Sequence, residues 1–527
     1  MSPRVGVNPV GVPPDTPLAG ARTLAARGVL WLSVGSWGAK GAQTAALLVL
    51  ARVLVPSQFG ILAIAALTYN VLSAVNELGV SDALTYLEDR IEEASRTALS
   101  MVLVTGLILM GVTWVLAPVI ASFFHSPAAT FVIRGFAVCL PFDAAASVPI
   151  GRLTRLLGFS RRAMTDALPS VIGAAVTIGV VVSGYPLIGL VAGQIAGSTA
   201  NFAVAMLVGP RCLPGWNTVM ARRLLSYGGY LSAADLLNLG LLNVDYIIVG
   251  HVLGPVALGY YSLAYRICFM PYLSISVVAN GAVFPYYCRL PSREAKARTA
   301  ENTFCIINAL SVPWFAGLVL FAGDIALLGH KWAPAVGAVR FLAVYGFFLS
   351  LILSALQVLK GVGRSDLVFL GRGLHLAILS AVLIATVRGG ITVVALDQAL
   401  VAGVIALLTG AWIVRHAGVR PAALGRSVAM PLLGALGMVL VVLLISRLPG
   451  ATSLRSVPSL KSVLILGPLA LAAFAAVLLA VMPEPLLKGW KALRGGSEGA
   501  LSAPRGGQRP TAEERGGGGQ CCPENER

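Results

Sequence analysis

Long apolar runs recur along almost the whole chain and are separated only by short breaks. A run of about 20 apolar residues crosses a bilayer as a helix, whereas the strands of a membrane barrel alternate apolar and polar residues. With 57% apolar and 12% charged residues and a mean hydropathy of +0.83, the chain has too few polar residues to cover a soluble globule. The sequence therefore predicts an all-α polytopic membrane protein.

We expect about fourteen transmembrane helices from these apolar runs. They are placed near residues 29–51, 59–81, 98–123, 129–150, 163–183, 185–208, 227–250, 257–287, 303–328, 335–358, 366–387, 389–413, 427–446 and 461–482.

The basic residues indicate how the chain is oriented. The formal net charge is +17, and the Lys and Arg residues gather in alternate breaks, near 152–162, 211–223 and 289–298. Basic loops stay on the cytoplasmic side of a membrane, so we expect both termini to be cytoplasmic and no nucleic acid to be bound. Residues 1–28 lack the apolar stretch of a removable signal, and the Gly-rich residues 483–527 are expected to be a disordered cytoplasmic tail.

Neither a metal nor a cofactor is expected. The seven cysteines show no ligand spacing, and no Gly-rich loop ending in lysine is present to cradle the phosphates of a nucleotide. The driving force would then be an ion gradient or consumption of the product.

An internal repeat determines the predicted architecture. The segment "RVLVPSQFG" (52–60) recurs as "HVLGPVALG" (251–259) at a shift of 199 residues. Further matches at slowly increasing shifts pair Arg96 with Arg298 and His125 with His330. Because each copy holds six spans, both copies enter the membrane from the same side, related by a pseudo-twofold axis along the membrane normal.

The predicted organisation is two parallel six-helix bundles with two further helices outside the repeat. The parts are a cytoplasmic segment at 1–28, bundles at 29–208 and 227–414 joined by a cytoplasmic linker at 209–226, added helices within 427–482 and the tail at 483–527. The expected binding site is the cavity between the two bundles.

Charged residues at membrane depth are candidates for that cavity. Lys40 lies about 18 Å from each end of the first span, where an uncompensated charge is costly. In the equivalent helix of the second repeat, Asp235, Asn238 and Asp245 fall on one stripe within an arc of about 80°. We therefore hypothesise that Lys40 pairs with Asp235 or Asp245.

The stretch "LGYYSLAYRI" (258–267) adds an arginine to the same depth. Its copy in the first repeat keeps Gly60 but lacks the tyrosines and the arginine. We expect Tyr260 and Tyr261 at the membrane interface and Arg266 facing the cavity. Further residues that could couple an ion or line the cavity are Asn70, Glu77, Asp143, Arg372 and Asp397.

Three strings closely resemble bacterial lipopolysaccharide and exopolysaccharide flippases of the Wzx type, within the multidrug/oligosaccharidyl-lipid/polysaccharide exporter superfamily. They are "ARVLVPSQFGILAIA" (51–65), "NELGVSDALTYLED" (76–89) and "LNVDYIIVGHVLGPVALGYYSLAYRI" (242–267), and the resemblance covers about residues 29–420. The positions that occupy the motif are Ala51, Arg52, Leu54, Pro56, Phe59, Gly60, Asp245, Gly250, Gly254, Gly259, Tyr260, Tyr261, Tyr265 and Arg266. His251 stands where relatives usually have arginine, and Pro255 replaces a common small residue.

The resemblance implies a membrane transporter that is not an enzyme. It would move a polyprenyl-pyrophosphate-linked oligosaccharide from the cytoplasmic to the outer leaflet of the bacterial inner membrane, beside a polysaccharide polymerase and a chain-length regulator. Cations would hold the pyrophosphate, and amides and carboxylates would hold sugar hydroxyls. The expected cavity residues are Lys40, Asp235, Asn238, Asn243, Asp245 and Arg266.

Two other transporter functions stay open at this point. An ion-coupled exporter of cationic drugs would use Asp143, Asp235 and Asp245 as its main site, and a lipid II flippase would have the same fold. A membrane glycosyltransferase or ligase is disfavoured because the acidic cluster "EDRIEE" (88–93) belongs to a predicted cytoplasmic helix end.

Overall fold

The described structure, a computed structural model, is built of helices. It covers residues 38–77, 90–156, 159–210, 212–290, 292–446 and 460–481, and these residues contain no strand. The described residues belong to one compact unit. The predicted segments 1–28 and 483–527 lie outside the described residues.

The first half of the chain begins with a helix over residues 38–53. It continues with α2 (Pro56–Glu77), α4 (Ile91–Phe123), α5 (Ala129–Ala137), α6 (Leu140–Arg155), α7 (Phe159–Val182) and α8 (Pro186–Val208). The second half holds α9 (Thr218–Val252), α10 (Gly254–Pro271), a π-helical turn η1 (Tyr272–Val277), α11 (Val278–Arg289), α12 (Arg293–Leu320), the 3-10 turns η2 (Ala322–Leu328) and η3 (His330–Ala335), α13 (Val336–Gly361), α14 (Ser365–Thr386), η4 (Val387–Gly389) and α15 (Ile391–Ala417).

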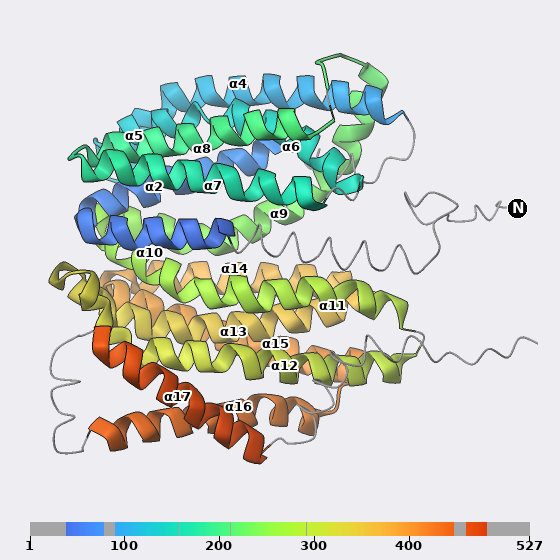
Figure 1. Ribbon diagram of the computed structural model, residues 1–527. Helices are drawn as coiled ribbons and strands as arrows, with labels where there is room; N and C mark the ends of the chain where they lie inside the picture. Colours follow the sequence, from blue (N-terminus) through green and yellow to red (C-terminus); the bar gives the residue numbers. More distant parts are fainter. Residues whose placement is uncertain are drawn as a thin grey trace, which may run out of the picture. The chain divides into compact units, whose positions relative to one another are not determined.

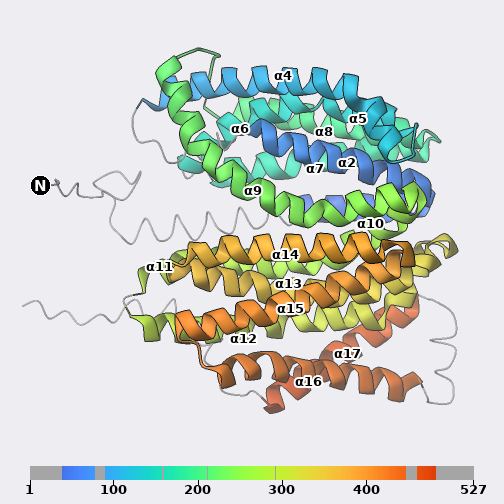
Figure 2. The ribbon, with the colours of Figure 1, turned by 180° about the vertical axis from the view of Figure 1, so that it is seen from behind.

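Two last helices follow the second half. They are α16 (Pro421–Ser446) and α17 (Leu460–Val481), which pack against each other and against α12 (Figure 2).

Eleven helices among the described residues are long and apolar enough to cross a membrane. Two shorter apolar helices, Leu237–Val252 and Leu466–Ala480, lie at two further predicted spans, and the helix over 38–53 lies in the first. The all-helical membrane fold is therefore confirmed, but a count of fourteen spans is not. The division into six-helix bundles stays a prediction, and α9 already begins at Thr218, inside the predicted linker.

Helices α2 and α10 lie side by side where the two halves meet (Figure 1). A Cβ built on Gly60 would lie 1.8 Å from the Pro255 carbonyl oxygen, and one built on Gly259 would lie 1.9 Å from the Pro56 carbonyl oxygen. A shift of 199 residues relates Gly60 to Gly259 and Pro56 to Pro255. The contact is thus reciprocal, as a pseudo-twofold axis between α2 and α10 requires.

A second reciprocal pair of contacts joins the halves at the end that holds Pro56 and Pro255. Arg52 Nη2 lies 3.5 Å from the Leu327 carbonyl oxygen. His251, at the equivalent position, donates from Nδ1 to the Phe123 carbonyl oxygen at 2.7 Å and stacks on the Phe123 ring. The imidazole therefore fills the place that arginine has in the first repeat.

The span after α10 changes its helical type at membrane depth. Pro271 lacks a backbone N–H, and the π-helical turn η1 follows it directly. Ser276, inside this turn, donates to Ser350, and Asn280 of α11 donates to Ser354, which ties this span to α13. These buried hydrogen bonds hold the irregular turn in one register.

Candidate functional site

A cavity of about 930 Å³ opens beside the first-half helices. Its lining comes from helix 38–53, α2, α6, α7 and α8, from Phe136 of α5 and from Arg266 of α10. Among its described lining residues, Arg266 alone belongs to the second half. The cavity therefore lies mostly within the first half, not symmetrically between two bundles as the repeat predicted.

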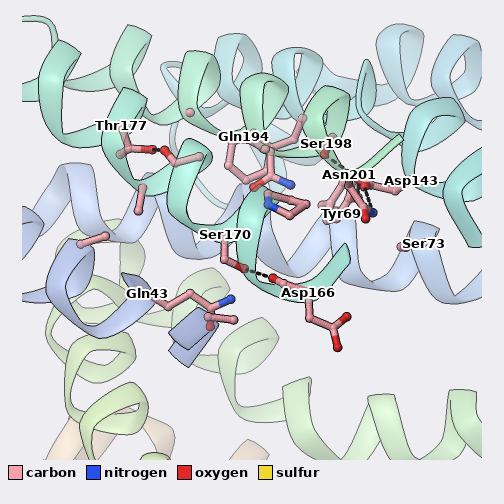
Figure 3. Close-up of a pocket in the computed structure, with 18 of the residues that line it drawn as sticks. Gln43, Tyr69, Ser73, Asp143, Asp166, Ser170, Thr177, Gln194, Ser198 and Asn201 are labelled. Carbon is pink, nitrogen blue, oxygen red and sulfur yellow. Dashed lines mark hydrogen bonds between the residues drawn. The ribbon is translucent and has the colours of Figure 1, made fainter. Parts of the chain in front are cut away.

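Asp143 is the centre of a hydrogen-bonded cluster on the cavity wall (Figure 3). Its carboxylate accepts hydrogen bonds from the Tyr69 hydroxyl of α2 and the Ser198 hydroxyl of α8. Asn201 Nδ2 donates to its other oxygen at 3.0 Å. Three neutral donors thus hold this carboxylate, and no described ion pair includes it.

Further polar side chains extend the lining from Asp143 along α7 and α8. Arg162 Nη2 lies 3.4 Å from Asp166 Oδ1, and both side chains are half-buried. Ser170 and Thr177 donate to carbonyl oxygens of their own helix, while Gln194 of α8 faces the same space (Figure 3). The wall formed by α7 and α8 therefore offers hydroxyl, amide and carboxylate groups inside an apolar span.

The opposite wall carries two cations at membrane depth. Lys40 lies on helix 38–53, and its Nζ is 3.5 Å from the Leu273 carbonyl oxygen. Arg266 is partly buried and lies beside the Tyr246 hydroxyl. The prediction that Arg266 faces the cavity agrees with this position, and Glu77 adds an exposed carboxylate to the lining.

Asp245 lies away from this cavity, contrary to its expected place in the lining. It is fully buried, and Oδ2 accepts hydrogen bonds from the Tyr261 hydroxyl at 2.6 Å and from Gln398 Nε2 at 2.7 Å. Oδ1 accepts from the Tyr246 backbone N–H. The carboxylate thus ties α9 to α10 and α15, and Tyr261 is a core residue rather than the interfacial one that we expected.

The hypothesised pair between Lys40 and Asp245 is not formed. The oxygens of Asp245 are occupied by neutral donors, and the described ion pairs do not include Lys40. The Asp235 side chain lies outside the described part of the chain. The stripe on α9 stays a prediction, and the Asp245 side chain at one end of it contacts its own half.

The remaining predicted residues lie in different environments outside the cavity. Asn243 donates to the Leu239 carbonyl oxygen in its own helix, and Asn238 is partly buried outside the cavity lining. Asn70 is exposed, and Arg372 lies near Tyr272. Asp397 is buried and accepts a hydrogen bond from Thr386. None of these residues lines the cavity.

Sequence reasoning missed the partners of Asp143. Ser198 and Asn201 are three residues apart on α8, so they share a helix face with each other and with Gln194. Polar residues at that spacing in an apolar helix were the available signal. Tyr69 gave none, because a single tyrosine in a span also fits an interfacial belt.

The arrangement offers polar and charged partners to a bound molecule. It combines Lys40 and Arg266 on one wall with carboxylates, amides, hydroxyls and the Arg162 guanidinium, which pairs with Asp166, on the other. In the described residues, no group of three or more His, Cys, Asp or Glu side chains is placed to hold a metal ion.

Comparison with known proteins finds relatives that are named for the biosynthesis of succinoglycan and of teichuronic acid. A succinoglycan biosynthesis transport protein, ExoT of Rhizobium meliloti (strain 1021), is 23% identical over 435 residues, which cover 81% of this chain and 87% of ExoT. The teichuronic acid biosynthesis protein TuaB of Bacillus subtilis (strain 168) is 25% identical over 357 residues, or 65% of this chain and 72% of TuaB.

Solved structures share the fold at low sequence identity. A lipid II flippase, MurJ, in an inward closed conformation superposes with a TM-score of 0.70 at 12% identity, covering 89% of this chain and 99% of MurJ. An inward-facing multidrug resistance MATE transporter of the MOP superfamily gives a TM-score of 0.52 at 15% identity, covering 72% of this chain and 94% of the transporter. A family model described as "Polysaccharide biosynthesis protein" matches residues 49–337, more than half of the 527 residues. The chain therefore belongs to this family of polysaccharide biosynthesis proteins, as a multi-pass membrane protein with the MOP transporter fold.

Proposed function

We propose that this protein moves the head group of a polyprenyl-pyrophosphate-linked oligosaccharide from the cytoplasmic to the outer leaflet of the bacterial inner membrane. Its relatives include a protein named for succinoglycan transport and one named for teichuronic acid biosynthesis. The proposed role is transport without chemical change of the cargo, so we propose that the chain is not an enzyme. A polysaccharide polymerase and a chain-length regulator would receive the flipped unit.

The observation that carries the proposal is that two cations without a described carboxylate partner lie on one wall of the cavity, while Arg162 on the facing wall is paired with Asp166. Lys40 and Arg266 supply the positive charge that a pyrophosphate needs, while Asp143, Asn201 and Gln194 supply hydrogen-bond partners for sugar hydroxyls. Such interactions are strengthened where water is excluded. The polyprenyl tail is apolar and can remain in the surrounding lipid.

We assign the proposed substrate contacts accordingly. They are Lys40, Gln43, Glu77, Asp143, Gln194, Asn201 and Arg266, which all line the cavity. Asp245 and Asp397 would instead support the packing of the second half, because each is buried and hydrogen-bonded to neutral partners. No contact on the cavity wall supports a role for Asn70, Asn238, Asn243 or Arg372 in substrate binding.

Alternating access would carry the head group across the membrane. The reciprocal contacts of Gly60 and Gly259 close the end of the molecule that holds Pro56 and Pro255. In the proposed orientation, with both termini cytoplasmic, this is the outer end. Separation of α2 from α10 at that end would open the cavity to the outer leaflet.

Two other cargoes are alternatives that the experiment below can distinguish. An exporter of cationic drugs would rely on Asp143 and would have little use for Lys40 and Arg266 on the facing wall. A lipid II flippase would also carry an anionic cargo that is linked to a lipid. The similarity to MurJ, at 12% identity, concerns the fold alone.

The test is a clean deletion in the producing strain, without a paralogue, followed by complementation. Lipid-linked repeat units should accumulate in the cytoplasmic leaflet, and the wild-type gene should restore their export. Normal surface polysaccharide in the deletion strain would overturn the proposal. Drug hypersensitivity with normal polysaccharide would indicate the drug exporter, and rescue of cells depleted of their lipid II flippase would indicate that cargo.

A further inference from the structure

One contact between the two halves contains a side chain that can gain and lose a proton. His251 is the next-to-last residue of α9, and its side chain is exposed. Its ring stacks on the Phe123 ring, with the centroids 4.1 Å apart and the planes 13° from parallel, while Nδ1 donates to the Phe123 carbonyl oxygen at 2.7 Å. Phe123 is the last residue of α4, so the contact joins the ends of α4 and α9. In the proposed orientation it lies at the outer end of the molecule.

The two helices also approach closely beside these rings. A Cβ built on Gly250 would lie 2.8 Å from the Phe124 ring. Phe124 is buried, and its ring meets the Phe123 ring edge to face at 5.0 Å. The imidazole is thus held in one place against α4 while the halves touch, and it loses these contacts when α4 and α9 separate.

A proton on His251 strengthens this contact for three physical reasons. The carbonyl groups at the C-terminal end of a helix carry a partial negative charge, which favours a cation beside them. A hydrogen bond from a cationic donor is stronger than one from a neutral donor. A cation over the face of an aromatic ring is attracted to the ring. Because all three act only while α4 and α9 are in contact, the closed end binds the proton more tightly than the open end, and acid favours the closed end.

His125 is the neighbour that opposes a second proton. Its side chain is exposed, and its ring lies 5.6 Å from the His251 ring, so two positive charges there would repel each other. On α9 itself the nearest ionisable residue is Asp245, about 9 Å away along the helix axis, where neutral donors hold its oxygens.

The other elements that pack on α9 bring few ionisable groups to this end. These elements are α2, α10, α14, α15 and η4, and the outer turns of α2, α4 and α14 carry no ionisable residue. The outer turns of the remaining three hold Tyr260, Tyr261, Arg388 and Asp397. None of these four has a described hydrogen bond, ion pair or ring contact with His251.

The internal repeat provides an equivalent contact that does not respond to pH. A shift of 199 residues places Arg52 at the position of His251, and Arg52 Nη2 lies 3.5 Å from the Leu327 carbonyl oxygen. A guanidinium stays charged throughout the physiological range of pH. Of these two equivalent contacts, only the one between α4 and α9 can therefore lose its positive charge.

We propose that His251 makes the opening of the outer end depend on the external pH. Acid outside the cell keeps α4 and α9 together, and loss of the proton toward neutral pH lets them separate. Neither His251 nor Phe123 lines the cavity, so this contact regulates access and does not bind the cargo. The inference rests on the proposed alternating access and adds regulation by external pH to it.

The opening of the outer end can be measured with two spin labels. In a cysteine-free background, Tyr185→Cys between α7 and α8 and Ala333→Cys in η3 place one exposed label on each half at that end. The distance between the labels is recorded by pulsed electron paramagnetic resonance in phospholipid nanodiscs at about pH 5.5 and about pH 8, which span the ordinary titration of imidazole. We expect the population with the longer distance to grow about fivefold at the higher pH. Identical distance distributions at the two pH values would overturn the inference.

Two variants of His251 assign the response to its charge. His251→Arg keeps a positive charge at both pH values, so the shorter distance should dominate at both. His251→Gln cannot become charged, so its population with the longer distance should be the same at both. A pH response of wild-type size in either variant would overturn the inference.

Two further histidines provide matched controls. His330→Gln changes an exposed imidazole at the position that the repeat makes equivalent to His125, and it should respond to pH as the wild type does. His125→Gln should respond at least as strongly, because it removes the opposing charge. Loss of the response in either control would assign it to another histidine and overturn the role of His251.

The label measurement can be separated from the identity of the cargo, because no cargo is present in the nanodiscs. Failure of the proposed transport function would appear as normal surface polysaccharide in the deletion strain. Failure of the present inference would appear as a distance distribution that ignores pH or ignores His251.

Discussion

Gly60 packs directly on the backbone of Pro255: a Cβ on the glycine would lie 1.8 Å from the proline carbonyl oxygen. Gly259 repeats this relationship with Pro56 at 1.9 Å. Only a residue without a Cβ allows two helices to approach so closely. The two halves of the repeat therefore meet through these glycines.

Gly60→Ala should separate α2 from α10. The added methyl group meets backbone atoms that cannot rotate away, so we expect a loss of about 1–3 kcal/mol in the free energy of unfolding. Thermal unfolding in detergent measures it. Gly111→Ala, on an exposed face of α4 with no atom within 4 Å, should not lower the unfolding temperature. Equal stability of both variants would contradict the close crossing.

Asp245→Ala should destabilise the second half. It removes the acceptor of the buried Tyr261 hydroxyl and one of the two acceptors of the Gln398 amide, and an unsatisfied buried group costs about 1–3 kcal/mol. Tyr261→Phe should lower stability by a smaller amount. Tyr260→Phe is the control, because the Tyr260 ring contacts Trp332 and the substitution keeps that ring. Unchanged stability of Asp245→Ala would show that this network is not structural.

The fold was predictable because the hydrophobic spans are long. The repeat paired Gly60 with Gly259, but it did not say that α2 and α10 cross at these residues, which the structure shows. The direction in which polar residues face was harder to predict. Helical spacing placed Asp235, Asn238 and Asp245 on one stripe, but it did not say which neighbour that stripe meets. In a membrane both the protein core and the lipid are apolar, so hydrophobicity does not distinguish an inner face from an outer one.

Asp143 and Asp245 illustrate the limit of predicting side-chain surroundings from sequence. Both are carboxylates in apolar spans, yet one lines the cavity and the other is buried against Tyr261 and Gln398. Their partners come from helices distant in sequence, Asn201 for the first and Gln398 for the second. Such contacts depend on helix rotation and on irregular turns such as η1, which local sequence patterns do not specify.

Asp143→Asn should impair export while leaving the protein folded. The substitution keeps an acceptor for Tyr69 and Ser198 but removes the charge that faces the cavity. Losing one charge-assisted contact of about 1.4 kcal/mol or more lowers transport about tenfold. Export of labelled repeat units and thermal unfolding should be measured on the same preparation. Asp366→Asn, at an exposed surface pair with Arg364, serves as the control and should export normally.

Arg266→Ala should also reduce export without preventing membrane insertion. The guanidinium lies on the cavity wall, and a lysine can replace its charge but not its paired donors. We expect Arg266→Lys to retain partial export and Arg161→Ala, an exposed arginine outside the cavity lining, to retain all of it. Normal export by Arg266→Ala at wild-type protein levels would remove Arg266 from the proposed site.

The sidedness of the lipid-linked repeat unit tests the central claim most directly. In the deletion strain, a membrane-impermeant glycan-labelling reagent should reach the unit in inside-out vesicles but not in intact spheroplasts. Complementation with the wild-type gene should make it accessible from outside, and the double variant Lys40→Met with Arg266→Ala should not. Outer-leaflet accessibility that is the same with and without the gene would contradict the account.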